Sequence, residues 1–129
     1  TLKKLKTDNK PFFLMVESSQ IDWGGHANDL PYIISEFKEF SLAINSAVEY
    51  AKNDKNTLVV VTADHETGGL AIKKGNLKKN SVSGDFTTIG HSGSMVPVFS
   101  YGTNSEIFSG IYDNTAIYDK FKTAVDQKN

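Results

Sequence analysis

Apolar positions follow two distinct rhythms along this chain, and each rhythm predicts one kind of element. Residues 12–16 and 57–63 form short, nearly continuous apolar runs, which are typical of strands buried on both faces of a parallel sheet. Between them, apolar residues recur every three or four positions from Asp29 to Asn53, as they do along one face of a helix. Strand, helix and strand in this order predict a βαβ unit with a right-handed crossover.

Local signals support the start of the long helix. Asn28 or Asp29 is a suitable N-cap, and Pro31 falls in the first turn, where proline is tolerated. The segment before it, residues 18–28, is polar and contains glycine. We therefore predict a loop there.

The rest of the chain predicts smaller elements. Residues 1–7 fit the end of a helix and residues 8–11 fit a turn, while residues 68–89 suggest an irregular excursion with a hairpin around Lys74 to Asn76. Residues 96–101 predict a strand, in which Pro97 indicates an edge or a strand start.

A last helix is predicted from Asp113, as its cap, to Val125. The apolar positions expected to face inward are Ile117, Phe121, Ala124 and Val125. Taken together, the predicted elements indicate an α/β fold.

Composition narrows the class of protein. The chain has 129 residues, which is enough for one domain with one core. Its content of 39% hydrophobic and 22% charged residues argues against disorder. A net charge of −1 without a dense basic stripe gives no reason to expect a nucleic-acid-binding surface. No apolar run approaches the roughly 20 residues that span a bilayer. The absence of cysteine excludes disulfides and thiolate metal sites.

Each of the three histidines stands beside a carboxylate or in a glycine-rich loop. Asp22 and His26 are four residues apart, His65 follows Asp64 directly, and His91 lies between Gly90 and Ser92-Gly93. Imidazole and carboxylate together suit zinc, whose catalytic sites take three protein ligands and leave one position open.

Taken one at a time, these motifs have simpler readings. An Asp-x-x-x-His pair is also typical of a helix cap with a surface histidine, and a glutamate after an apolar run is commonly a loop residue. Ligands of open α/β sheets gather at the carboxyl ends of strands, however, and the ligand-type residues all fall there or in a loop leading to a strand. We predict that one site unites Glu17, Asp22, His26, Asp64, His65 and His91.

Four stretches of the chain resemble motifs from the second half of the alkaline phosphatases and follow one another in the same order as in that family. Their sequences are most similar to those of bacterial members. The stretches are Phe12-Phe13-Leu14-Met15-Val16-Glu17 with Ile21-Asp22-x-x-x-His26, Val59 to Gly69, His91-Ser92-Gly93 before Val96-Pro97-Val98, and Phe108 to Asn114. The resemblance implies that residues 1–129 are a single C-terminal portion of a catalytic domain. The implied fold is a three-layer sandwich with a mostly parallel sheet and a βαβ core.

The same resemblance implies a role for each ligand-type residue. It implies a first zinc held by Asp22, His26 and His91, a second zinc that receives Asp64 and His65, and a magnesium bound near Glu17. For the intact enzyme it further implies a phosphate monoester substrate, a homodimer, and a periplasmic or secreted location.

Several groups that the family requires are not found in this chain. The family uses a serine nucleophile beside an aspartate, a further upstream aspartate, and an arginine that grips phosphate. All fourteen basic residues here are lysines, and no serine has an Asp-Ser-Ala context. We expect the chain to be a piece of a longer protein and to be inactive alone, with an exposed apolar face or sheet edge where the rest packs.

The three ligands of the first zinc are nevertheless all present. We expect weak zinc binding at Asp22, His26 and His91 that is lost below about pH 6.5, the ordinary histidine pKa. Two other functions remain open. One is another metal-dependent enzyme of the same superfamily, such as a phosphodiesterase or a cofactor-independent phosphoglycerate mutase. The other is a non-enzymatic metal-binding α/β module.

Overall fold

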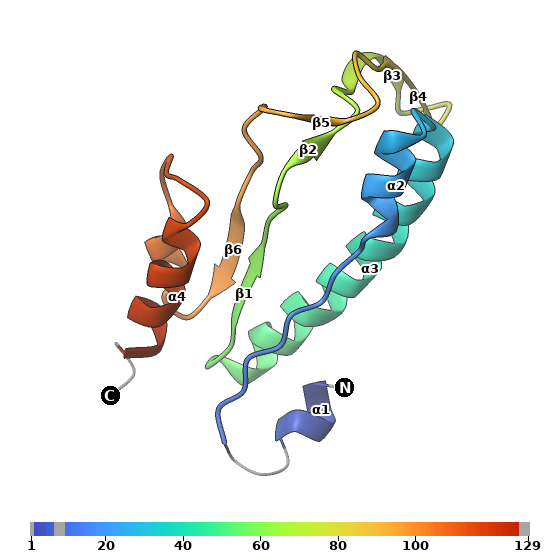
Figure 1. The fold of residues 1–129 in the computed structure, drawn as a ribbon. Helices are drawn as coiled ribbons and strands as arrows, with labels where there is room; N and C mark the ends of the chain where they lie inside the picture. The colour runs from blue at the N-terminus through green and yellow to red at the C-terminus, as the bar shows by residue number, and fades with distance from the viewer. Residues whose placement is uncertain (1, 7–9, 127–129) are drawn as a thin grey trace. The chain divides into compact units, whose positions relative to one another are not determined.

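The computed structural model describes residues 2–6 and 10–126, which divide between two compact units. The first unit lies within Thr1–Ala43 and His65–Met95, and the second within Ile44–Asp64 and Val96–Asn129. The long helix α3 (Leu30–Asp54) begins in the first unit and ends in the second (Figure 1). It confirms the helix predicted from Asp29 to Asn53.

The first unit combines short helices with two antiparallel ladders. Its elements are α1 (Leu2–Leu5), α2 (Gln20–His26), the start of α3, β2 (Glu66–Thr67), β3 (Ala71–Asn76), β4 (Ser81–Asp85) and β5 (His91–Ser92). The ladder β2–β5 pairs Glu66 with Ser92 and Thr67 with His91. Strands β3 and β4 form a hairpin within the predicted excursion, but its turn lies at residues 77–80, because Lys74 to Asn76 belong to β3. The predicted helix end over residues 1–7 is present as α1 (Leu2–Leu5), whereas residues 8 and 9 of the turn predicted at 8–11 lie outside the described residues.

The loop predicted over residues 18–28 is wrong, because Gln20 to His26 form helix α2. Two glycines in seven residues disfavour a helix by propensity alone, but both are needed for packing. A Cβ on Gly24 would lie 2.8 Å from Ile33 Cγ1, and one on Gly25 would lie 2.8 Å from the carbonyl oxygen of Thr67. Close approach of α2 to α3 and β2 therefore overrides the weak propensity.

The start of α3 is capped as predicted. The backbone N–H of Tyr32 donates to Asp29 Oδ1 at 3.0 Å, which satisfies one of the unpaired amide groups of the first turn. Asp29 thus ends the connection from α2 and orients the helix that Gly24 packs against.

The strand predicted over residues 12–16 is not formed. This segment belongs to no ladder of the described residues, and Phe13 and Met15 are 73% and 78% exposed. A strand buried on both faces needs neighbours on both edges and layers above and below, and the described part of the chain supplies no pairing strand. The expected parallel βαβ unit is absent for the same reason, since every ladder among the described residues is antiparallel.

The second unit contains the end of α3 and the remaining elements. They are β1 (Leu58–Val61), β6 (Phe99–Gly102), the 3₁₀ helix η2 (Ser105–Phe108) and α4 (Ala116–Asp126). Strands β1 and β6 lie side by side and antiparallel, with Leu58 opposite Gly102 and Val61 opposite Phe99 (Figure 1). A strand is present where residues 57–63 predicted one, but it covers only Leu58–Val61 and is half-buried and antiparallel, not buried in a parallel sheet. The one predicted over 96–101 begins only at Phe99, beyond Pro97, which has no N–H for a ladder.

Apolar burial in the second unit centres on Phe108. Ala51, Phe108 and Ala124 are 3%, 3% and 6% exposed, and the ring of Phe108 meets that of Phe121 edge to face at 5.0 Å between centroids. Helix α4 confirms the helix predicted over 113–125. The inward orientation predicted for Val125 is wrong, because its side chain is 66% exposed.

Asp113 caps the segment that leads into α4. Its Oδ1 accepts from the backbone N–H of Thr115 at 3.0 Å and from the Thr115 hydroxyl at 2.8 Å. These two bonds, the backbone one first, lower the pKa of the Asp113 carboxyl from its ordinary value of 3.8. The capping role predicted from the sequence is confirmed.

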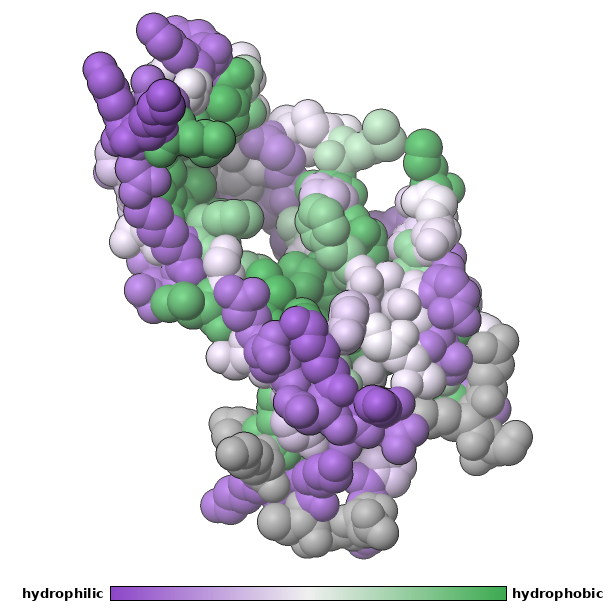
Figure 2. All heavy atoms as spheres, turned by 180° about the vertical axis from the view of Figure 1, so that it is seen from behind, coloured by the Kyte–Doolittle hydropathy of each residue, from purple (hydrophilic) through white to green (hydrophobic). Residues whose placement is uncertain are grey.

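Large apolar side chains are exposed in many parts of the described chain, and Figure 2 shows hydrophobic surface among hydrophilic residues on one face. The continuous run from Phe12 to Val16 contributes five of them. Such runs of exposed apolar surface mark places where other protein packs. Among the described residues, no helix has both the length and the apolar character needed to cross a membrane.

Candidate metal centre

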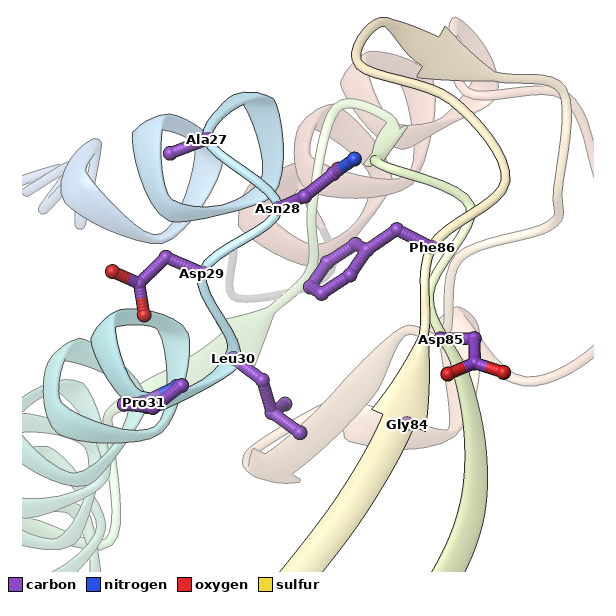
Figure 3. Close-up of a pocket in the computed structure, with 8 residues that line it drawn as sticks. All are labelled: Ala27, Asn28, Asp29, Leu30, Pro31, Gly84, Asp85 and Phe86. Atoms are coloured by element: carbon purple, nitrogen blue, oxygen red, sulfur yellow. The ribbon is translucent and has the colours of Figure 1, made fainter.

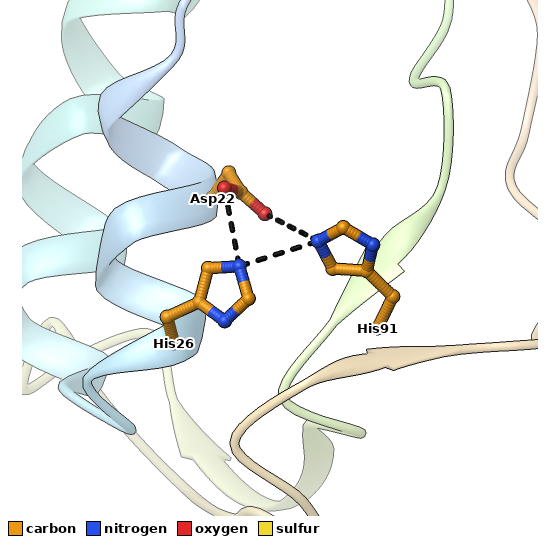
Figure 4. Close-up of side chains that lie close together, drawn as sticks. All are labelled: Asp22, His26 and His91. Atoms are coloured by element: carbon orange, nitrogen blue, oxygen red, sulfur yellow. Dashed lines mark hydrogen bonds and ion pairs between the residues drawn. The ribbon is translucent and has the colours of Figure 1, made fainter.

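Helix α2 and strand β5 bring three ligand-type side chains together within the first unit. Asp22 and His26 are one helical turn apart and so lie on the same face of α2. His91 is placed by the β2–β5 ladder, in which it pairs with Thr67, and α2 itself contacts β2. The three side chains point toward one another (Figure 4).

The distances among these groups suit a shared cation. The ligand atoms of Asp22, His26 and His91 all lie within 4.8 Å of one another. The two Nε2 atoms are 3.2 Å apart, and Asp22 carboxylate oxygens lie 3.5 Å from Nε2 of His26 and 3.7 Å from Nε2 of His91. A tetrahedral ion bound at zinc distances separates its ligand atoms by about 3.3 Å. The observed triangle therefore fits zinc with little adjustment.

A hydrogen bond presents His26 correctly for such a role. Its Nδ1 lies 2.6 Å from the carbonyl oxygen of Ile89, and because a carbonyl only accepts, Nδ1 carries the proton. The lone pair is then on Nε2, which faces Asp22 and His91. Metal-binding histidines are commonly oriented by a carbonyl in this way. The side chains of Asp22, His26 and His91 are 35–50% exposed, so the centre is open to solvent.

His65 joins the group by stacking and through a hydroxyl. Its ring lies over that of His91, with centroids 3.5 Å apart and planes 21° from parallel. Thr67 Oγ1 is 3.2 Å from His65 Nδ1 and donates to Asp22 Oδ1 at 2.5 Å. Thr67 thus connects two predicted ligands, a role that the sequence analysis missed. The only signal was its place in the stretch His65-Glu66-Thr67-Gly68-Gly69.

Glu66 fastens the strand that carries these groups. Its carboxylate accepts from the hydroxyl of Ser92 and from the backbone N–H groups of Gly69 and Leu70, the latter two at 3.1 and 3.2 Å. The hydroxyl of Ser92, ahead of the two backbone groups, lowers the pKa of Glu66 from its ordinary value of 4.5. Glu66 therefore ties β2 to β5 beside His65 and His91, another role that the sequence analysis missed.

The six predicted ligands are only partly united. The structure places Asp22, His26 and His91 close together, and His65 stacks on His91. Glu17 is exposed in the segment that forms no strand, and it lies outside the group formed by Asp22, His26 and His91. Asp64 is exposed and belongs to the second unit. Metal binding by any of the six residues stays a prediction.

A hollow elsewhere in the first unit offers weaker chemistry. It has a volume of about 620 Å³ and is lined by Ala27, Asn28, Asp29, Leu30, Pro31, Gly84, Asp85 and Phe86 (Figure 3). Asp29 caps α3, and Asp85 pairs with Lys73 at 2.5 Å. The two carboxylates point away from each other in Figure 3. The hollow therefore lacks the converging ligands that distinguish the candidate metal centre.

Comparison with known proteins identifies the family. The model of the alkaline phosphatase family matches residues 1–84. Alkaline phosphatase 3 of Bacillus subtilis (strain 168) is 33% identical over 186 aligned residues, which cover 90% of this chain and 40% of the relative. This chain belongs to the alkaline phosphatase family.

Solved structures agree in fold. The alkaline phosphatase of the Antarctic bacterium TAB5 matches with a TM-score of 0.89 and 47% identity, over 97% of this chain and 38% of the other. A histidine-to-aspartate variant of that enzyme, described with Mg bound in a site named M3, matches with a TM-score of 0.86 and 48% identity, over 97% of this chain and 39% of the other. The chain thus spans about two fifths of the length of these relatives.

Proposed function

We propose that residues 1–129 are the C-terminal metal-binding portion of a phosphate monoester hydrolase of the alkaline phosphatase type. The observation that carries this proposal is the triangle of Asp22, His26 and His91 ligand atoms within 4.8 Å. The orientation of His26 by the Ile89 carbonyl supports it, as does membership of the alkaline phosphatase family.

The proposed site takes two zinc ions and one magnesium ion. Asp22, His26 and His91 bind the first zinc, Asp64 and His65 contribute to the second, and Glu17 contributes to magnesium. Two metals in a hydrolase of this kind stabilise both the attacking and the leaving oxygen of the displacement. Magnesium prefers oxygen ligands and retains waters, which suits an exposed glutamate. The Mg bound in the variant of the TAB5 enzyme is in keeping with this assignment.

Each residue of the first zinc site has a definite task. Asp22 supplies negative charge that offsets part of the charge of the cation. His26 offers the Nε2 lone pair that its hydrogen bond to Ile89 leaves available. His91 approaches from β5 and, at 50% side-chain exposure, leaves one side of the centre open for a phosphate oxygen. An open fourth position is what separates catalytic from structural zinc sites.

The remaining machinery is proposed to come from the other part of a longer protein. This chain offers no arginine and no serine in the required context, so we propose that it is inactive alone. The exposed segment 12–16 would become a central strand of the parallel, three-layer sandwich once partner strands flank it. A homodimer and a periplasmic or secreted location complete the proposal for the intact enzyme.

Zinc titration of the intact protein tests the proposed site. At neutral pH we expect zinc uptake by the wild type and a loss of affinity of more than about 100-fold in His91→Gln, because even loss of a ligand's hydrogen-bond partner costs about 10–100-fold. Asp85→Asn removes an exposed carboxylate outside the centre and should bind as the wild type does. A wild type that takes up no zinc, or a His91→Gln variant with unchanged affinity, would contradict the proposal.

Activity distinguishes the enzyme from the non-enzymatic alternative. The intact protein should release phosphate from a simple aryl phosphate in the presence of zinc and magnesium, and His91→Gln should reduce this rate sharply. The 129-residue chain alone should release none. A folded, zinc-loaded intact protein without phosphatase activity would favour a metal-binding module.

A further inference from the structure

We infer that Thr67 is a positioning residue that couples the proposed ligands of the two zinc ions, Asp22 and His65, through a single hydroxyl group. The inference rests on the proposed function, because it concerns how this chain prepares that site. Thr67 is on β2, opposite His91 in the ladder and in contact with α2. It therefore stands between the helix and the strand that carry the candidate ligands.

The hydrogen-bond donors and acceptors at this hydroxyl permit one arrangement. Thr67 Oγ1 is 2.5 Å from Asp22 Oδ1 and 3.2 Å from His65 Nδ1. An ionised carboxylate only accepts, so the single hydroxyl proton points to Asp22. The hydroxyl can then only accept from His65, and Nδ1 must carry the imidazole proton. His65 is left with its lone pair on Nε2, the form that a metal requires.

The same hydroxyl fixes Asp22. Oδ1 is held by Thr67, while Oδ2 lies 3.5 Å from Nε2 of His26. The carboxylate is therefore restrained in one orientation before any cation arrives, which lowers the conformational cost of binding. One hydroxyl in this way sets the rotamer of one proposed ligand and the tautomer of another.

The rest of the Thr67 side chain has a separate, structural task. A Cβ on Gly25 would lie 2.9 Å from both Cβ and Cγ2 of Thr67, so the methyl group fills the close contact with α2. Hydroxyl and methyl can be removed one at a time. Thr67→Val keeps the methyl and the shape but loses the hydroxyl, whereas Thr67→Ser keeps the hydroxyl and loses the methyl.

The test compares these two variants with the wild type in the intact protein. Zinc affinity and stoichiometry are measured by calorimetry at neutral pH. We expect Thr67→Val to bind zinc about 10–100-fold more weakly, the usual effect of removing a hydrogen-bond partner of a metal ligand. Thr67→Ser should remain within a few-fold of the wild type. The reverse order, with serine weak and valine unaffected, would show that Thr67 acts by packing alone and would overturn the inference.

A second readout needs no metal. In the metal-free protein, nitrogen NMR shifts of His65 report which ring nitrogen carries the proton. We expect the Nδ1–H tautomer in the wild type and in Thr67→Ser, and loss of this preference in Thr67→Val. An unchanged tautomer in a folded Thr67→Val protein would overturn the inference even where the wild type binds zinc. Failure of the wild type to bind zinc would instead count against the proposed function, with the tautomer still deciding the role of Thr67.

Discussion

The two units of this chain differ in the contacts that stabilise each of them internally. In the described part of the first unit, the buried residues are Gly24, Gly25 and Gly68. In the second unit, they are Ala51, Phe108 and Ala124. Backbone segments in the first unit therefore meet at glycines and are joined by polar side chains, whereas the second unit buries apolar ones.

The comparison indicates what the proposed metal would contribute to the first unit. Apolar burial is the main favourable term in folding, and the described first unit has little of it. The hydrogen bonds of the first unit, each worth about 0.5–1.5 kcal/mol net, compensate only in part for this small apolar burial. Metal binding adds its free energy to the stability of the elements that supply the ligands. Under the proposed function, the first zinc would add stability to the first unit, whose elements α2 and β5 carry Asp22, His26 and His91.

The largest expected effect is a loss of unfolding free energy when the apolar core of the second unit is truncated. Phe108→Ala removes a ring that is 3% exposed and packed against Phe121, and such truncations cost about 3–5 kcal/mol of unfolding free energy. Denaturant unfolding of the intact protein measures the loss. Tyr118→Ala, on the same unit but 74% exposed, serves as the control and should cost far less. Equal losses in the two variants would remove the distinction between the units.

Gly25→Ala is expected to lower the unfolding free energy less than Phe108→Ala does, and to weaken zinc binding as well. The new Cβ would lie 2.8 Å from a backbone oxygen of Thr67, and such overpacking costs about 1–3 kcal/mol. Alanine regains up to about 1 kcal/mol of helix propensity, so the net effect is destabilising. Because α2 carries Asp22 and His26, zinc affinity should fall more than about tenfold. Gly93→Ala, where nothing lies within 4 Å of the added Cβ, should bind zinc normally.

The smallest expected effect is the pH dependence contributed by Asp113. Its pKa is lower in the folded protein than its ordinary value of 3.8, so the fold favours the ionised form. Its contribution is therefore complete above pH 3.8 and is lost as pH falls through the folded pKa. Urea unfolding at neutral pH and well below pH 3.8 should show a wild-type advantage over Asp113→Ala that shrinks on acidification. An advantage that grows in acid would reverse the assigned sign.

Long, locally determined elements were predictable from the sequence. Helix α3 follows from its apolar period and its Asp29 cap, and β1 from its β-branched run. The residue types at Asp22, His26, His65 and His91 indicated a metal site from the sequence, and metal binding there stays a prediction. Their proximity, however, comes from packing that the sequence analysis did not predict, because Asp22 and His26 lie on helix α2 and His91 lies in strand β5.

What the sequence did not reveal depends on contacts between distant segments. Helix α2 was missed because tertiary packing at Gly24 and Gly25 overrides helix propensity. The apolar run 12–16 has the composition of a buried strand, yet pairing requires neighbours that the described residues do not provide. Thr67 and Glu66 were missed because a hydroxyl or carboxylate gains its role only from the groups that the fold places around it.

The central claim is that Asp22, His26 and His91 converge on one cation, and anomalous diffraction tests it most directly. Crystals of the intact protein, grown with zinc, are measured on both sides of the zinc absorption edge. The account predicts an anomalous peak about 2.0–2.1 Å from Nε2 of His26 and Nε2 of His91 and within bonding reach of the Asp22 carboxylate. Fully ordered side chains at all three positions with no peak among them would contradict it.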